Sequence, residues 1–266
     1  SFYLPSLLYA FCTGLLIPIL PLYAADFEIS YGLIGVVLAA ELIGLAVGDI
    51  PAGLLVQRFG IKRVMVLGIG VVSIAVGALF WMQTIWLVII CRLLSGFSLA
   101  LFNVSRHVYL AETLKLETRG RFIAVLGGVR RAGMFTGPAV GGIVATQYGL
   151  RAPFFLFMII CLVAFFTIII FLNVETPATS NKVHVPQVSV LSTLRLHYYV
   201  LMTAGGGFLF AMMIRHGSKV VIPLYGANVL GLSAQEIGFI VSISSAVDMM
   251  LFYPAGWVMD NLGRKY

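Results

Sequence analysis

The chain has 266 residues, of which 61% are hydrophobic and 10% are charged, and its mean hydropathy is +1.04. Soluble domains carry about 25% charged residues, so this composition excludes a soluble globular protein and indicates a protein of the lipid bilayer. The net charge of +7 includes no dense basic tract and falls mainly in short loops, which argues against nucleic-acid binding.

Eight apolar runs are long enough to cross about 30 Å of hydrocarbon as helices. They cover residues 3 to 25, 31 to 56, 63 to 82, 86 to 110, 121 to 147, 152 to 173, 198 to 227 and 234 to 258. The runs are continuous rather than alternating, which favours helices over the strands of a membrane barrel. The predicted fold class is therefore an all-α, multi-pass membrane protein.

Basic residues mark one side of the predicted bundle. The loops on that side contain Arg58, Lys62, Arg63, Lys115, Arg119, Arg121, Lys182, Arg195, Arg264 and Lys265. The opposite loops contain little beyond Arg151. By the positive-inside rule, the loops that follow helices two, four and six are cytoplasmic, and the expected location is the plasma or inner membrane.

The longest polar stretch, residues 174 to 197, predicts a cytoplasmic linker between an N-terminal bundle, residues 1 to 173, and residues 198 to 266. The sequence LPLY at 20 to 23 returns as IPLY at 222 to 225. Helices seven and eight therefore repeat helices one and two, as in transporters built from two similar halves. Because the chain starts with Ser and stops within a loop motif, we expect an excerpt, with four further helices after its end.

The stretch GDIPAGLLVQRFGIKR, residues 48 to 63, resembles the loop between helices 2 and 3 of the major facilitator superfamily. The matching residues are Gly53, Arg58, Gly60 and Lys62 in the first copy and Gly256, Asp260, Gly263, Arg264 and Lys265 in the repeat. The resemblance implies gating loops, in which a tight glycine turn and charges lock the cytoplasmic face between two states, with Asp49 as a brace. Gln57 stands where the family has Asp, and a plain positive-inside turn is the alternative interpretation.

Further stretches resemble the branch of that superfamily that holds drug:proton antiporters. They are PILPLYAADF at 18 to 27, CRLLSGFSLA at 91 to 100, and GMFTGPAVGG at 133 to 142. The last carries Gly133, Gly137, Pro138, Gly141 and Gly142. Glycines spaced by four keep one helix face bare so that another helix can pack closely, with or without a role in the mechanism, and the proline bends the helix. The resemblance implies the major facilitator fold, with eight of twelve helices present.

Charged residues within the predicted helices are costly, so each needs a partner, water or a function. They are Glu41, Arg92, Arg130, Arg131, Arg215, Lys219 and Asp248, with His216 beside them. The third and sixth helices have none between their ends, and we expect the phenylalanines of the sixth to face lipid, namely Phe154, Phe155, Phe157, Phe165 and Phe166. The resemblance implies that the third and sixth helices face lipid and lie outside the cavity.

We interpret Glu41 as the proton carrier, because a carboxyl group in a partly dry cavity can load and release a proton near neutral pH, and Asp248 as a second candidate. The resemblance adds Arg92 to the proton-coupling group. A permanent salt bridge from Glu41 to Arg92 or Arg130 is the alternative.

The cationic residues Arg130, Arg131, Arg215, His216 and Lys219 are candidates for the substrate cavity. Arg215 and Lys219 share one helix face and need water, an anionic ligand or an acidic partner such as Asp248. A charge-paired network that only holds helices together remains open for this set. The cysteines and histidines show no metal-ligand spacing, so no metal site and no cofactor are predicted.

The sequence has no phosphate-binding GxxxxGK[ST] loop and no pair of nucleophile and base, so neither ATP-driven pumping nor an enzyme is expected. The leading hypothesis is a monomeric secondary transporter that exchanges protons for small amphipathic compounds by alternating access. Buried cations outnumber deep acids, which favours an alternative, transport of organic anions or of phosphorylated or carboxylated metabolites. A membrane scaffold or sensor without transport is the third possibility.

Overall fold

The computed structural model describes residues 3–113, 116–172 and 198–262, and these residues form helices without any strand. The helices are α1 (Tyr3–Leu16), α2 (Ile19–Ala25), α3 (Tyr31–Phe59), α4 (Ile61–Gly77), α5 (Ile85–Thr113), α6 (Leu116–Tyr148), α7 (Ala152–Phe171), α9 (Tyr198–Asn228) and α10 (Ala234–Leu262), with a short 3-10 helix η1 (Ala78–Phe80) after α4. All eight predicted spans are therefore present within the described residues. Six of them are long and apolar enough to cross a membrane by length and composition alone.

The first predicted span differs from the structure because it is divided into α1 and α2. Pro18 has no N–H to donate to a carbonyl one turn back, and the N–H of Ile17 donates to Gly14 O in a tight turn (3.1 Å). Other helices extend past their predicted ends; α6 begins at residue 116 and α10 ends at residue 262. The apolar runs mark only the hydrocarbon layer, and the helices continue into the polar interface.

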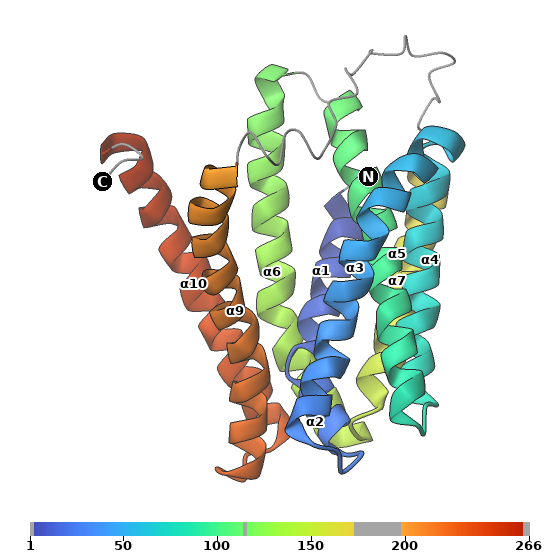
Figure 1. The fold of residues 1–266 in the computed structure, drawn as a ribbon, viewed down its shortest axis with the longest axis vertical. Helices are drawn as coiled ribbons and strands as arrows, with labels where there is room; N and C mark the ends of the chain where they lie inside the picture. The colour runs from blue at the N-terminus through green and yellow to red at the C-terminus, as the bar shows by residue number, and fades with distance from the viewer. Residues whose placement is uncertain (1–2, 114–115, 173–197, 263–266) are drawn as a thin grey trace.

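The helices lie side by side along the long axis, with α10 next to α6 (Figure 1), while α9 contacts α2 and α10. The closest approach joins α3 to α5, where an added Cβ on Gly96 would collide with the carbonyl oxygen of Glu41 and lie 2.8 Å from Leu45 N. Added Cβ atoms on Gly44 and Gly48 of α3 would likewise lie too close to the backbone of α5. Bare glycine faces thus bring the two backbones together, which fixes the positions of the charged side chains that they carry.

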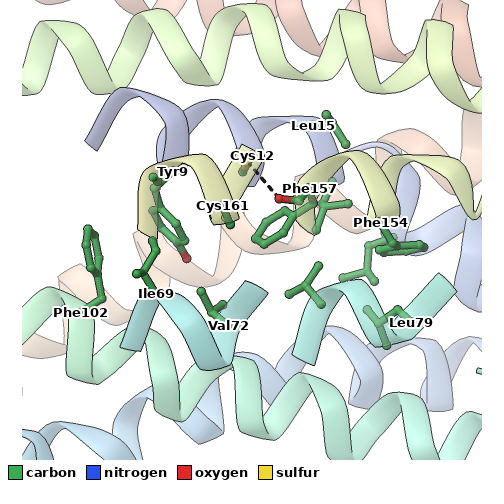
Figure 2. Packing of buried hydrophobic residues seen from close by; sticks show 14 of the residues in the cluster. Tyr9, Cys12, Leu15, Ile69, Val72, Leu79, Phe102, Phe154, Phe157 and Cys161 are labelled. Atoms are coloured by element: carbon green, nitrogen blue, oxygen red, sulfur yellow. Dashed lines mark hydrogen bonds between the residues drawn. The ribbon is translucent and has the colours of Figure 1, made fainter. Parts of the chain in front are cut away.

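The core lies between α1, α4 and α7 (Figure 2). Phe154 and Phe157 are 0% and 2% exposed, so the prediction that they face lipid is wrong. Both lie on the face of α7 that packs against α1 and α4, and Phe154 makes an edge contact with Tyr23 at 4.7 Å between ring centroids. Phe155 and Phe166 lie on the opposite face and are exposed, as predicted.

Candidate functional site

A cavity of about 570 Å³ lies among the helices. Its wall comes mainly from α1, α3, α5, α6 and α9, and none of the described residues of α10 lines it. Five of the residues singled out in the sequence line it, namely Glu41, Arg92, Arg130, His216 and Lys219. The rest of the wall is mostly apolar. The cavity therefore combines a few charged groups with a large apolar surface, as small-molecule sites do.

Glu41 and Arg92 form an ion pair inside the cavity, with side chains 19% and 8% exposed. The close approach of α3 and α5 at Gly96, one turn after Arg92, places the two groups opposite each other. The salt bridge that the sequence left as an alternative is therefore present in this conformation. The pair joins α3 to α5 inside the cavity wall.

Arg106 lines the same cavity and was missed in the sequence. It is 8% exposed, its Cζ lies 5.8 Å from the centroid of the Phe102 ring, and its Nε has no hydrogen-bond partner among the described residues. The signal was its spacing from Arg92: 14 residues make nearly four helical turns, so both point to one face of α5.

Three candidates do not line the cavity. The Nη1 of Arg131 donates to Gly127 O on its own helix (3.4 Å). Arg215 and Asp248 pair with each other at 3.7 Å, as anticipated, but their side chains are 63% and 69% exposed. Asp248 is therefore separated from the ion pair of Glu41.

The first predicted gating loop is a sharp turn between α3 and α4. Gly60 has φ of 85°, a conformation that favours glycine, and α4 begins at the next residue. Lys62 Nζ donates to Ile169 O on α7 (2.9 Å), while Arg58 and Asp49 are exposed. Of the second copy, Gly256 and Asp260 fall within the span of α10 where side chains are not described, and Gly263, Arg264 and Lys265 lie outside the described residues.

The glycine motif of α6 faces two helices at once. Added Cβ atoms on Gly133 and Gly137 would lie 2.7 Å from Phe11 N and 2.5 Å from Phe11 O of α1, and one on Gly141 would meet Leu15 O. On the adjacent face, an added Cβ on Gly142 would lie 2.5 Å from Ala234 O of α10. The glycine spacing predicted a close helix approach, and α6 makes two such approaches, one to α1 and one to α10. We call the contact between α6 and α10 the seam.

Hydrogen bonds also join α6 to α10, beginning next to Pro138. The N–H of Ala139 donates to the hydroxyl of Ser242 on α10 at 2.9 Å, and the N–H of Gln235 donates to Thr146 Oγ1 at 3.0 Å. These contacts lie toward the ends of α6 and α10 that are opposite to the basic loops. We call this end of the bundle the outer end.

Replacing Gly141 by Ala is expected to lower the melting temperature of the protein markedly, because the methyl group would collide with the backbone of α1. Overpacking of this kind costs about 1 to 3 kcal/mol. Gly128→Ala on the same helix is the matched control, since nothing lies within 4 Å of an added Cβ there. Thermal unfolding of both purified variants measures the difference, and equal melting temperatures would contradict the packing described.

Comparison with known proteins gives the family. The family model of the Major Facilitator Superfamily matches residues 3–266. The chain belongs to the major facilitator superfamily. Membership in this superfamily and the multiple apolar helices make it a multi-pass integral membrane protein.

Several curated relatives of this superfamily member are known by name. It is 25% identical to Multidrug resistance protein 2 of Bacillus subtilis over 261 residues, covering 95% of this chain and 64% of the relative. It is 24% identical to the multi-drug resistance efflux pump PmrA of Streptococcus pneumoniae, over 96% of this chain and 65% of the relative. It is 24% identical to the class B tetracycline resistance protein of Escherichia coli, over 98% of this chain and 66% of the relative. The chain thus spans somewhat less than two thirds of these relatives.

The fold has a solved counterpart. The crystal structure of a D-xylose-proton symporter superposes with a TM-score of 0.69 at 17% sequence identity, over 97% of this chain and 67% of that one. The likeness establishes the major facilitator fold for the described helices.

Proposed function

We propose that the full-length protein is a secondary transporter that exports small amphipathic compounds in exchange for protons. The observation that carries the proposal is the Glu41–Arg92 ion pair in the wall of a largely apolar cavity. The cavity is suited to an amphipathic solute, and the carboxylate supplies a group that can take up a proton. The multidrug and tetracycline resistance proteins among the relatives support the same function.

The coupling step follows from electrostatics. A proton on Glu41 neutralises the carboxylate and removes its attraction to Arg92, so α3 and α5 are freed from one constraint that holds this conformation. Loss of the proton restores the pair. Protonation thereby biases the equilibrium between two conformations, and a solute that prefers the deprotonated one moves in the opposite direction to the proton.

The seam between α6 and α10 supplies the second element of alternating access. It holds the outer end of the cavity together by backbone contact at Gly142 and by the hydrogen bond from Ala139 to Ser242. In this proposal residues 1 to 173 and the part from 198 onward rock about the cavity as a monomer, joined by a cytoplasmic linker at 174 to 197.

The test uses proteoliposomes that contain the full-length protein, with the membrane potential clamped at zero. We expect an acidic interior to drive accumulation of an amphipathic dye, either rhodamine 123, a cation, or fluorescein, an anion on a similar ring system. Rapid filtration measures uptake with and without the pH gradient. Dye uptake that occurs at the same rate in both conditions would contradict proton coupling.

A further inference from the structure

The charges in the cavity wall do not balance. Glu41 is the one carboxylate among the described residues that line the cavity, and Arg92 already pairs with it. Arg106, Arg130 and Lys219 also line the cavity, and none of them has a carboxylate within ion-pair distance among the described residues. Among the described residues, the cavity therefore holds three cations without an ion-pair partner.

These three cations come from three helices, α5, α6 and α9, and all three line one cavity. Arg106 is buried, Lys219 is half-buried and Arg130 is exposed. Arg106 is the most confined of the three, because 92% of its surface is buried and its Nε lacks a partner among the described residues. A buried cation without a counter-ion is costly, and an anion that enters the cavity would offset that cost.

The surroundings limit which anion fits. Apolar side chains such as Leu126, Met134, Phe157 and Val220 line the same cavity. A small inorganic anion would leave this apolar surface in contact with water, whereas a compound with an apolar body and one anionic group would use both parts.

We propose that Arg106, Arg130 and Lys219 form a subsite for the carboxylate, sulfonate or phosphate group of an amphipathic organic anion, whose apolar body lies on the neighbouring apolar wall. The compound is the solute of the transport cycle proposed above, and to that extent the inference rests on the proposed function. The guanidinium groups of Arg106 and Arg130 donate to the anionic oxygens, and the ammonium group of Lys219 adds a third positive charge. Glu41 keeps Arg92 as its partner, so the subsite does not use the carboxylate that the proton step requires.

The experiment measures binding rather than transport. The full-length protein is reconstituted in nanodiscs of phosphatidylcholine, and fluorescence anisotropy gives the affinity for fluorescein and for rhodamine 123 at pH 7.5. We expect Arg106→Gln, Arg130→Gln and Lys219→Gln each to weaken fluorescein binding about tenfold or more, since each removes a charge-assisted hydrogen bond. Rhodamine 123, with the opposite charge, should bind these variants as well as or better than it binds the wild type.

Two further variants separate charge from folding. Arg106→Lys keeps the charge and should retain most of the fluorescein affinity. Arg63→Gln removes an arginine that is exposed on α4 and does not line the cavity, so it should bind fluorescein as the wild type does. A variant that loses affinity for both dyes has lost the cavity, so rhodamine 123 binding serves as the internal measure of intact folding.

The outcomes decide between the inference and its competitors. Failure of the wild type to bind fluorescein, or equal affinity in the three Gln variants, overturns the subsite. Loss of fluorescein binding when phosphatidylglycerol replaces part of the phosphatidylcholine assigns the cations to lipid headgroups and also overturns it. Selective loss of fluorescein affinity in the three variants supports the subsite even if fluorescein uptake proves independent of the pH gradient, in which case proton coupling alone fails.

Discussion

Replacing Glu41 by Gln is expected to abolish pH-driven dye uptake while leaving exchange of dye across the membrane without a pH gradient. The change removes the protonatable group but keeps an oxygen that can accept a hydrogen bond from Arg92. A transporter without its proton carrier can still move solute down a gradient, so the loss should appear only in the coupled assay. Uptake by rapid filtration, with and without the gradient, measures both rates in the same vesicles.

Two control variants test whether a loss of coupling in Glu41→Gln comes only from a loss of folding. Glu112→Gln makes the same chemical change at an exposed carboxylate near the end of α5, and should leave coupling intact. Glu41→Gln also leaves the charge of Arg92 unpaired in a buried position, which typically costs about 3 to 5 kcal/mol. The double variant Glu41→Gln with Arg92→Gln should therefore melt higher than the single variant without regaining coupling. Normal pH-driven uptake in Glu41→Gln would exclude Glu41 as the carrier.

Most of the fold followed from the sequence because a membrane imposes one dominant constraint. A lipid-facing backbone must hydrogen-bond to itself, so each long apolar run becomes a helix. Local chemistry explains what was missed. Pro18 ends α1 after Leu16, and the helices extend beyond the apolar runs because the interface also permits helix. Phe154 and Phe157 show the limit of composition, since an apolar side chain in a membrane helix faces lipid or protein with equal ease.

The candidate site was harder to predict because it depends on which side of each helix faces the cavity. Charge alone identified Glu41, Arg92, Arg130 and Lys219, since a charge within a span needs a polar environment. Charge alone could not show that Arg215 lies outside the cavity. Its side chain is exposed, although Lys219, one turn further along α9, lines the cavity. Arg106 was not singled out in the sequence, although its register with Arg92 points to the same face of α5.

Replacing Gly142 by Val is expected to open the outer end of the bundle and to lower coupled transport at least about tenfold, because overpacking by even a few methyl groups costs about 1 to 3 kcal/mol. Gly142 differs from Gly141 in what it contacts. An added Cβ would lie 2.5 Å from Ala234 O and 2.9 Å from Gln235 Cα, both on α10, so the strain falls on the seam and not on the packing of α1. The conformation with a closed outer end is therefore penalised relative to one in which α10 has moved away.

Spin labels at Tyr31→Cys and Asn228→Cys report this opening, because the two side chains lie 3.4 Å apart, between Asn228 Nδ2 and Tyr31 Oη, at the outer ends of α3 and α9. In a background without the native cysteines, Gly142→Val should shift the label distances to longer values, while Gly128→Val, in open space on the same helix, should leave them unchanged. If the seam were only a packing device, Gly142→Val would lower the melting temperature and leave the distance distribution as it is. A shift in distance at a nearly normal melting temperature would instead identify Gly142 as part of the outer gate, because only a residue between two moving parts changes the conformational equilibrium more than the stability.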